Sequence, residues 1–259
     1  MIPNKIKNHT IGIIPARFGS TRFQGKVLAK IAGKPMIQWV YERAIQAKLL
    51  QRVIVATDES KVKQVVEGFG GVVLMTSNKH ETGTDRVAEI ADQVEADVIV
   101  NIQVDEPLIS PQAIDELIEP FSHDNVIMAT LCRKANNVEE IYSANTVKVV
   151  FDKNQNALYF SRAPIPFNRD FQSRNDRLNI ADYFQHIGIY AYRKEFLLKL
   201  TELPQTRLEK IEKLEQLRAL ENGFNIKVIQ TNYNPVCVDV KEDIRKVEEL
   251  MNVMEPLHA

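Results

Sequence analysis

The sequence predicts an α/β fold, in which a mostly parallel, doubly wound sheet is followed by a smaller mixed α+β lobe. Short apolar runs alternate with amphipathic helical segments from Ile11 to Phe121, which is typical of a parallel sheet with helices on both faces. Beyond Asn125 the apolar runs change in character, and two of them resemble a hairpin. The length of 259 residues allows one large domain, or a core domain with a second lobe.

The first half of the chain contains four predicted strands, each followed by a helical segment. Apolar runs bounded by turn residues, typical of buried parallel strands, cover 11–14, 52–58, 72–75 and 97–102. Helical spacing of apolar residues predicts helices over 36–49, 60–69 and 86–94. A fourth helix is expected to begin after Ser110-Pro111, because this pair favours an N-cap and a first turn.

The second half of the chain is predicted to contain a different arrangement. Strands are expected over 126–131, 146–151, 157–160, 186–192, 226–229 and 236–240, with the second and third forming a hairpin. Helices are expected over 194–200, 206–222 and 242–253, and the polar stretch 168–179 is expected to be an exposed loop. We therefore expect residues 1–125 to form the α/β core, residues 126–235 the smaller lobe, and residues 236–259 to return to the core.

Composition and charge exclude several classes of protein. The chain is 44% hydrophobic and 26% charged, which is ordinary for a soluble globular protein. Its net charge of −1 offers nothing to nucleic acid or an anionic membrane, so any phosphate binding must be local. No apolar run approaches the length of a membrane span, and residues 1–10 are polar, so we expect no signal peptide. Cys132 and Cys237 lack metal-type spacing and are expected to be reduced thiols, which predicts a cytoplasmic protein.

The first structured stretch, residues 11–26, is the clearest sign of a binding site. A short buried strand leads directly into a loop that holds glycines, two hydroxyls and three basic side chains. Glycine lets the backbone approach a ligand, and backbone N–H groups beside Arg and Lys can cradle a phosphate. The same residues could form a solvated basic loop. We favour an anion site because Arg17, Arg22 and Lys26 follow the strand so closely.

Polar side chains follow all four predicted strands of the first half. Ligands of such sheets bind at the carboxyl ends of the strands, so we expect these side chains to gather at one edge. They are Arg17, Ser20 and Lys26 after the first strand, Asp58 after the second, Arg86 beyond the third, and Gln103 with Asp105 after the fourth.

Six segments of the chain carry a resemblance to a known family. They are PARFGSTRFQGK at 15–26, TGTDR at 82–86, NIQVDEP at 101–107, YFSRAPIP at 159–166, HIGIY at 186–190 and LEQLR at 214–218. In this order and spacing they closely resemble the 3-deoxy-manno-octulosonate cytidylyltransferases, the CMP-KDO synthetases of lipopolysaccharide assembly. The resemblance implies a nucleotidyltransferase-like fold and transfer of CMP from CTP to the anomeric hydroxyl of the sugar acid KDO, with release of diphosphate.

By this resemblance, the basic loop would hold the triphosphate of CTP. An in-line attack on the α-phosphorus builds negative charge on the phosphate oxygens and on the departing diphosphate. The protein is therefore expected mainly to position the substrates and to neutralise this charge. The implied nucleotide-binding residues are Arg17, Ser20, Lys26, Arg86 and Gln103, and the implied catalytic residues are Lys26, Arg17 and Asp105. Without the resemblance, Asp105 is also compatible with a loop or helix-start carboxylate.

The resemblance implies Mg²⁺ as cofactor, held by Asp105 and Asp239. Two carboxylates from separate strand ends suit a hard cation that keeps water and takes its other ligands from substrate phosphate. The metal would offset charge at the α-phosphate and lower the pKa of the sugar hydroxyl, so no protein base is required. Without the family, Asp239 is one acidic residue among 34 and indicates no metal.

The resemblance also implies a site for the sugar acid, whose carboxylate needs a cation and whose hydroxyls need hydrogen bonds. The implied residues are Gln103, Arg162, His186, Tyr190, Glu215 and Gln216. His186 and Tyr190 lie four residues apart in a predicted strand, so we expect both on one sheet face. Without the family, His186 is more typical of a structural histidine and Glu215 of a solvated helix charge.

Three segments depart from the family pattern. Residues 23–27, FQGKV, lack the two prolines of the usual Leu-Pro-Gly-Lys-Pro, so the loop has more entropy to lose on binding CTP. Val104 replaces a glycine before Asp105, and valine disfavours positive φ. Residues 239–243, DVKED, replace Asp-Thr-Pro-Glu-Asp and remove a cap-and-proline helix start.

Two alternatives remain open. The same chemistry could act on 8-amino-KDO or on another 2-keto-3-deoxy acid such as a sialic acid, because nothing in the sequence determines the group at the far end of the sugar. A nucleotide- or sugar-binding protein without turnover is the other alternative, motivated by Val104 and the changes at 23–27. The presence of Lys26, Asp105 and Asp239 favours an enzyme. CTP and KDO are the expected partners. The family implies a homodimer, formed through the lobe after Asn125.

Overall fold

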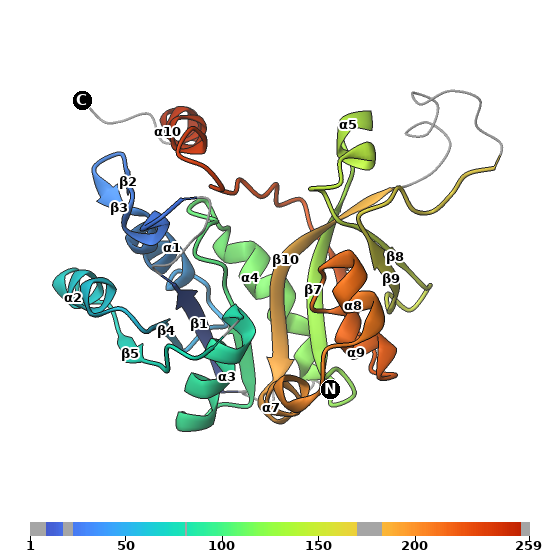
Figure 1. Cartoon of the computed structure of the whole chain (residues 1–259), viewed down its shortest axis with the longest axis horizontal. Coiled ribbons are helices and arrows are strands. Elements are labelled where there is room, and N and C mark those ends of the chain that lie inside the picture. The colour runs from blue at the N-terminus through green and yellow to red at the C-terminus, as the bar shows by residue number, and fades with distance from the viewer. Residues whose placement is uncertain (1–8, 18–22, 81, 170–182, 255–259) are drawn as a thin grey trace, which may run out of the picture. The chain divides into compact units, whose positions relative to one another are not determined.

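The structure is a computed structural model and describes residues 9–17, 23–80, 82–169 and 183–254 (Figure 1). Contacts divide the chain into two compact units. The first unit comprises the described residues within 9–115 and 235–254, and the second comprises the described residues within 116–234.

A parallel sheet forms the centre of the first unit. Its strands follow the order β6 (Val98–Asn101), β1 (Thr10–Ala16), β4 (Arg52–Thr57) and β5 (Val73–Met75). Each neighbouring pair is parallel, so that Ile13 lies opposite Ile54 on one side and Asn101 on the other. Every residue of β1 is buried, because the strand has a neighbour on each side and helices α1 and α3 against it. The predicted parallel α/β architecture is confirmed.

Helices connect these strands as the apolar spacing predicted. They are α1 (Met36–Ala44), α2 (Ser60–Gly68) and α3 (Gly83–Gln93). Helix α3 begins with a capping box, in which the Thr82 hydroxyl accepts from the Asp85 N–H at 3.1 Å and the Asp85 carboxylate accepts from the Thr82 N–H at 3.2 Å. A Cβ on Gly83 would lie 3.4 Å from Pro15 Cγ, so the start of α3 packs closely against β1.

The carboxyl-terminal part of the first unit differs from the prediction. The expected strand over 236–240 is wrong, because these residues pair with no strand in the described chain. Val238 is instead buried in an apolar cluster with Ile31, Met36, Leu108 and Val247. The alternation of apolar and polar residues over 236–240 therefore reflects the burial of Val238 in this cluster. Helix α10 (Asp243–Met254) follows, as expected.

Two small elements of the first unit were not predicted. A short 3-10 helix, η1 (Lys26–Leu28), precedes a hairpin of β2 (Lys30–Ile31) and β3 (Lys34–Pro35). Both fall between the first predicted strand and the first predicted helix, where the sequence indicated only a turn.

The second unit contains a mixed sheet, reached through α4 (Pro111–Ile118) and η2 (Glu119–Ser122). Its strands follow the order β11 (Lys227–Gln230), β7 (Met128–Lys134), β10 (Phe184–Arg193), β8 (Lys148–Phe151) and β9 (Ala157–Ser161). Strands β11 and β7 are parallel and the other pairs are antiparallel, which confirms the predicted β8–β9 hairpin. Helix α7 (Lys194–Glu202) was expected, whereas α5 (Val138–Tyr142) was not.

The single helix predicted over 206–222 is wrong. Two short helices, α8 (Arg207–Glu212) and α9 (Leu217–Glu221), replace it. Lys213 has a left-handed φ of 55°, which ends α8. Ile211, expected on the buried stripe, is 64% exposed, whereas Leu214 and Leu217 are buried. The turn between the helices therefore carries Glu215 and Gln216.

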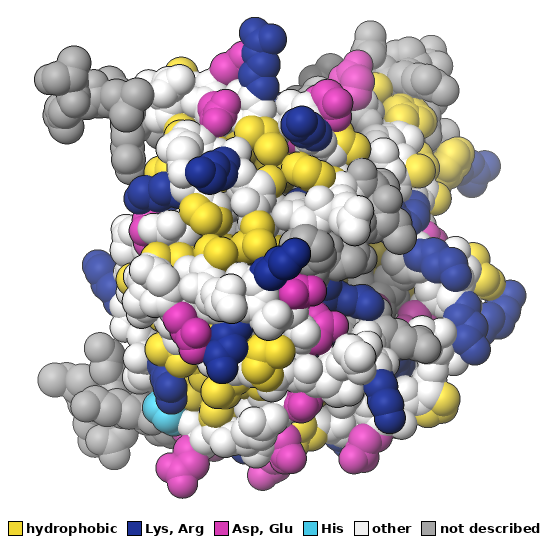
Figure 2. Space-filling view, turned by 60° about the vertical axis from the view of Figure 1, so that its left-hand side comes forward, with side chains coloured by type: hydrophobic (Ala, Val, Ile, Leu, Met, Phe, Trp, Pro, Cys, Tyr) yellow, Lys and Arg dark blue, Asp and Glu magenta, His cyan; other side chains and the backbone are white. Residues whose placement is uncertain are grey.

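The surface and the loops agree with an ordinary globular protein. On the face drawn in Figure 2, Lys and Arg side chains are interspersed with Asp and Glu. None of the helices in the described residues is long and apolar enough to cross a membrane. Most of the predicted loop over 168–179 lies outside the described residues, so it stays a prediction.

Candidate active site

Lys26 and Asp105 meet although 79 residues separate them in the sequence. The Lys26 Nζ lies 2.8 Å from the Asp105 Oδ2. Gly25, immediately before η1, has a φ of 69°, a left-handed conformation that glycine adopts without strain. The Lys26 side chain is 11% exposed and that of Asp105 is 30% exposed, so the ammonium is shielded while the carboxylate reaches solvent. The structure thus brings together two of the residues expected at the nucleotide site.

Asp239 lies on the chain segment beside Asp105. The Val238 N–H donates to the Asp105 carbonyl at 2.9 Å. The N–H groups of Asp239 and Val240 donate to the Asp243 carboxylate at 2.8 and 3.0 Å, so Asp243 caps this segment without the usual Thr-Pro pair. Cys237 retains exposed surface, but the packing around its thiol, followed by the negative charges of Glu106, Asp105 and Asp239, raises the pKa of that thiol. The two aspartates therefore lie around one thiol.

This pair of carboxylates fits the chemistry of a magnesium ligand set. Carboxylate oxygens are the hard donors that Mg²⁺ prefers, and this ion usually keeps several waters and takes substrate phosphate as ligand. Among the described residues, no group of three or more His, Cys, Asp and Glu side chains is arranged to hold a metal. An ion bound by Asp105 and Asp239 would therefore depend on water and phosphate for its remaining ligands.

The other residues expected at the first loop and after β6 have defined places, except one. Arg17 follows β1 and its Nη2 donates to the His80 carbonyl at 3.2 Å. Ser20 lies outside the described residues. Gln103 follows β6, and its Nε2 donates to the Asn101 side chain at 3.2 Å.

Val104 and Asp105 form the middle of a turn that the Glu106 N–H closes on the Gln103 carbonyl at 3.4 Å. Among the described residues, only Ala32, Gln155 and Lys213 combine a side chain with a positive φ, so Val104 does not. The turn therefore accommodates valine without left-handed backbone strain.

Arg86 is fully buried in α3. Its Nη2 donates to the Asp58 Oδ2 at 2.9 Å, and its Nη1 donates to the Thr76 hydroxyl. Asp58 follows β4 and Thr76 follows β5, so Arg86 joins the carboxyl ends of two strands. Arg86 thus contacts residues that follow two strands, and its expected role at the nucleotide stays a prediction.

In the second unit, His186 and Tyr190 lie on one face of β10. Their ring centroids are 5.5 Å apart, and Phe160 lies 4.9 Å from the imidazole. A register irregularity between Ile187 and Tyr190 shortens the strand locally, which allows this approach across four residues. The expectation that both side chains share a face is confirmed.

The environment of His186 keeps its imidazole neutral. Its Nε2 lies 2.9 Å from the Thr130 hydroxyl, which also lies 2.8 Å from the Ile189 carbonyl and 3.2 Å from that of Ile187. Both carbonyl oxygens can only accept, so this arrangement favours a hydroxyl proton directed at a carbonyl and an Nε2 hydrogen donated to Thr130. Burial lowers the pKa of His186 to about 3. The ring therefore presents Nδ1 as a hydrogen-bond acceptor.

Glu215 and Gln216 lie in the turn between α8 and α9. Burial raises the pKa of Tyr190, and the negative charge of Glu215 raises it further, so the two side chains are neighbours. Gln216 is only 4% exposed, and its buried Nε2 has no hydrogen-bond partner among the residues that the structure describes. A buried donor without a partner costs free energy unless a ligand or water satisfies it. This is the donor that a sugar hydroxyl could use.

Arg162 follows β9 and contacts the end of α8. Its Nε donates to the Glu212 carbonyl and its Nη1 to the Ala144 carbonyl, both at 2.8 Å. Its Nη2 donates to the Lys213 carbonyl at 3.5 Å. The guanidinium is partly exposed, and two of its five N–H groups have no partner among the described residues. His186, Tyr190 and Glu215, three of the residues expected to bind the sugar, are thus neighbours within the second unit. Arg162 contacts the end of α8, three residues before Glu215 in the sequence.

Sequence reasoning missed three residues that support this group. Thr130 fixes the imidazole, and Lys148 and Glu212 hold the backbone of Arg162. A lysine at an inward-facing position of a predicted strand, as in TVKVVF, was the available signal for Lys148. Thr130 and Glu212 had no comparable signal.

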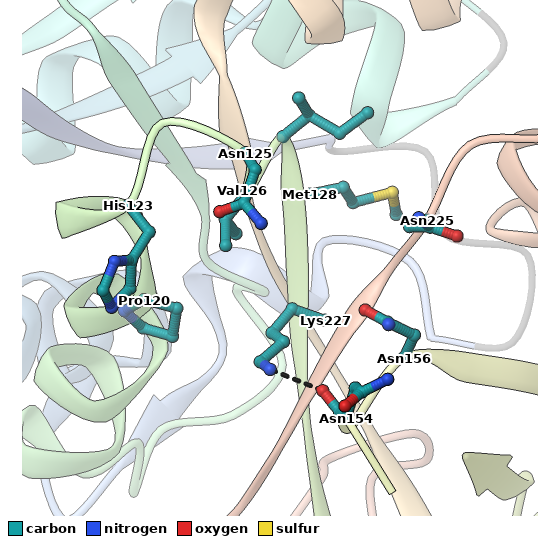
Figure 3. Close-up of a pocket in the computed structure, with 10 residues that line it drawn as sticks. Pro120, His123, Asn125, Val126, Met128, Asn154, Asn156, Asn225 and Lys227 are labelled. Atoms are coloured by element: carbon teal, nitrogen blue, oxygen red, sulfur yellow. Dashed lines mark hydrogen bonds between the residues drawn. The ribbon is translucent and has the colours of Figure 1, made fainter. Parts of the chain in front are cut away.

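A surface pocket of about 510 Å³ lies elsewhere in the second unit (Figure 3). Lys227 points toward Asn154 and donates to its carbonyl at 2.6 Å. Most of the remaining polar lining residues are exposed, and none of the expected sugar-binding residues lines the pocket. The pocket is therefore separate from the group around His186.

The fold, with polar residues at the carboxyl ends of parallel strands, is that of the α/β nucleotidyltransferase class. Residues 11–229 match the cytidylyltransferase family. The 3-deoxy-manno-octulosonate cytidylyltransferase of Trichlorobacter lovleyi is 50% identical over 246 residues, which cover 93% of this chain and 98% of the relative. That of Geobacter sulfurreducens is 50% identical over 242 residues, covering 92% and 97%.

A solved structure gives the same result. CMP:2-keto-3-deoxy-manno-octonic acid synthetase, complexed with CTP, is 42% identical and superimposes with a TM-score of 0.89 over 95% of this chain and 99% of that one. The chain belongs to the 3-deoxy-manno-octulosonate cytidylyltransferase family of cytidylyltransferases. The resemblance found in the six sequence segments is confirmed.

Proposed function

We propose that the protein transfers CMP from CTP to KDO, releasing diphosphate, as an activating step for lipopolysaccharide assembly. The observation that carries this proposal is the 50% identity to relatives of that name over nearly the whole of both chains. The retained Lys26, Asp105 and Asp239 support an enzyme over a protein that only binds.

The first unit would hold CTP. The anomeric hydroxyl oxygen of the sugar forms a bond to the α-phosphorus as the bond from that phosphorus to the diphosphate oxygen breaks, and the hydroxyl proton passes to water. Lys26 neutralises charge on the phosphates and Asp105 holds its ammonium in place. Mg²⁺, held by Asp105 and Asp239, would offset phosphate charge and lower the pKa of the attacking hydroxyl.

The second unit would hold the sugar acid. Arg162 supplies a cation for the carboxylate, while His186 Nδ1 accepts and Gln216 Nε2 donates hydrogen bonds to hydroxyls. Glu215 adds a carboxylate near Tyr190, whose ring packs against that of His186.

We further propose a cytoplasmic homodimer. The reaction consumes CTP, and Cys132 and Cys237 are both free thiols, which suits a reducing compartment. Exposed apolar side chains in the second unit, Leu158 at 63% and Phe167 at 76%, support an interface there. Light scattering after gel filtration tests the dimer, and Leu158→Glu should weaken it whereas Lys153→Glu should not.

The function is tested by diphosphate release from CTP and Mg²⁺ with KDO, 8-amino-KDO or N-acetylneuraminate. We expect kcat/KM for KDO to exceed that for the other two acids at least tenfold. Preference for 8-amino-KDO would correct the substrate. CTP binding without diphosphate release for any acid would show a binding protein and contradict the proposal.

A further inference from the structure

Lys148 is a fully buried lysine whose three donors all reach backbone carbonyls. It lies on β8 and is 1% exposed. Its Nζ donates to the carbonyls of Ser143 at 2.8 Å, Thr146 at 2.5 Å and Arg162 at 2.5 Å. An ammonium has three N–H groups, so its hydrogen-bonding capacity is used completely. One side chain thus ties the turn before β8 to the end of β9.

Glu212 holds the N–H of Arg162, the residue whose carbonyl Lys148 holds. Its Oε2 accepts from the Arg162 N–H at 2.9 Å, and its Oε1 accepts from the Ser161 hydroxyl at 2.6 Å. The backbone of Arg162 is therefore held at its N–H by a carboxylate and at its carbonyl by an ammonium. Such charge-assisted hydrogen bonds are stronger and shorter than neutral ones.

The two residues also fix the groups that hold the Arg162 side chain. The guanidinium donates to the carbonyls of Ala144 and Glu212, both at 2.8 Å. Ala144 lies in the turn that Lys148 holds. We call Lys148 and Glu212, which hold the two backbone groups of Arg162, the clamp. Backbone and side chain of Arg162 are thus set by the same two residues.

Stability alone gives a weak reason for this arrangement. Removing an ammonium from water is costly, and apolar residues of similar volume often serve stability as well or better. The clamp instead holds Arg162, whose partly exposed guanidinium has N–H groups left for a ligand.

We propose that Lys148 and Glu212 are positioning residues that hold Arg162 in the orientation needed to bind the carboxylate of the sugar acid. This rests on the proposed function. It predicts a defect confined to the sugar acid, because neither residue lies in the unit that contains Lys26 and Asp105.

Kinetics of Lys148→Met and Glu212→Gln test the proposal, with Lys153→Met as control, an exposed lysine on the turn of the same hairpin. We expect KM for KDO to rise at least tenfold in both variants, KM for CTP to change less than twofold, and the control to match wild type. Glu212→Gln keeps the side-chain shape and serves if Lys148→Met does not fold. Equal rises in both KM values, or a lowered melting temperature with unchanged KM for KDO, would overturn the proposal.

A pH profile adds a readout that a purely structural role would not move. Burial lowers the pKa of Lys148 to about 8, with Glu212 opposing this and Arg162 adding to it. The neighbouring Tyr159 has a raised pKa, and Gln185, opposite Lys148 on β10, does not ionise. KM for KDO should therefore rise between pH 7 and 9.5 in wild type, and this dependence should vanish in a folded Lys148→Met variant. The same profile in both proteins would contradict the proposal.

Amide hydrogen exchange separates this inference from the proposed function. Exchange at 143–147 and 161–163 should be faster in Lys148→Met and Glu212→Gln, with β1 unchanged. If wild type releases no diphosphate, the proposed function fails, and unchanged exchange at 161–163 would then independently refute the clamp.

Discussion

The Nζ of Lys26 lies 2.8 Å from the Oδ2 of Asp105, and the carbonyl of Asp105 accepts a hydrogen bond from the N–H of Val238. Asp105 thereby connects the loop after β1 with the segment that carries Asp239. A change at this carboxylate should disturb charge neutralisation without removing much packing.

Asp105→Asn should lower kcat at least 100-fold, because it removes the negative partner of Lys26 and a proposed metal ligand. The melting temperature should change by only a few degrees, since the side chain is 30% exposed. Diphosphate release and thermal unfolding measure both effects. Asp92→Asn, on the exposed surface of α3, is the control, and normal turnover in Asp105→Asn would refute the assignment.

Removal of divalent metal should abolish turnover. Excess EDTA is expected to reduce diphosphate release to background, and added Mg²⁺ should restore it. Asp239→Asn should raise the Mg²⁺ concentration for half-maximal rate at least tenfold while leaving KM for KDO unchanged, because only one proposed carboxylate ligand is lost. Full activity in EDTA would exclude Mg²⁺ dependence.

Arg86→Met should destabilise the first unit. The substitution leaves Asp58 and the Thr76 hydroxyl without their buried guanidinium donor, so unfolding in urea should show a loss of about 2–4 kcal/mol. Arg52→Met, at the exposed start of β4, is the matched control and should change the free energy of unfolding by less than about 0.5 kcal/mol. A loss below about 1 kcal/mol for Arg86→Met would contradict a joining role.

His186 should make stability fall in acid. Its pKa is about 3 in the folded protein and near 6.5 when unfolded, so below pH 6.5 the unfolded chain binds more protons. This group alone should lower the free energy of unfolding by up to about 1.4 kcal/mol per pH unit between these values, and its slope should fade to nearly zero above about pH 8.

Urea unfolding at a series of pH values compares wild type with His186→Gln. The variant should have the shallower slope below pH 6.5, whereas His123→Gln, at an exposed position, should retain the wild-type slope. Identical slopes in wild type and His186→Gln would mean that the imidazole is protonated in the fold.

Much of the first unit was predictable because buried parallel strands are continuous apolar runs. The apolar run at 11–14 therefore indicated β1. The approach of Lys26 to Asp105 follows because the carboxyl ends of parallel strands meet at one edge of the sheet. The break at Lys213 was not predictable. Apolar spacing continues through it, while the left-handed turn depends on tertiary contacts such as the Arg162 hydrogen bond to the Glu212 carbonyl.

The supporting residues of the sugar group show a second limit. In the sequence, Glu212 resembles an ordinary helix charge, and the only signal for Lys148 is its place within an apolar run. Folding alone places the two residues on either side of Arg162. The apolar alternation at Val236–Val240 likewise predicted a strand, although burial in the cluster around Val238 satisfies the same pattern.

The most direct test of the proposed reaction is phosphorus NMR of CTP, KDO and Mg²⁺ with the protein. We predict that the CTP signals are replaced by equal amounts of diphosphate and a phosphodiester of CMP, and only when KDO is present. Unchanged CTP, or its hydrolysis to free CMP without a phosphodiester, would contradict cytidylyl transfer to the sugar acid.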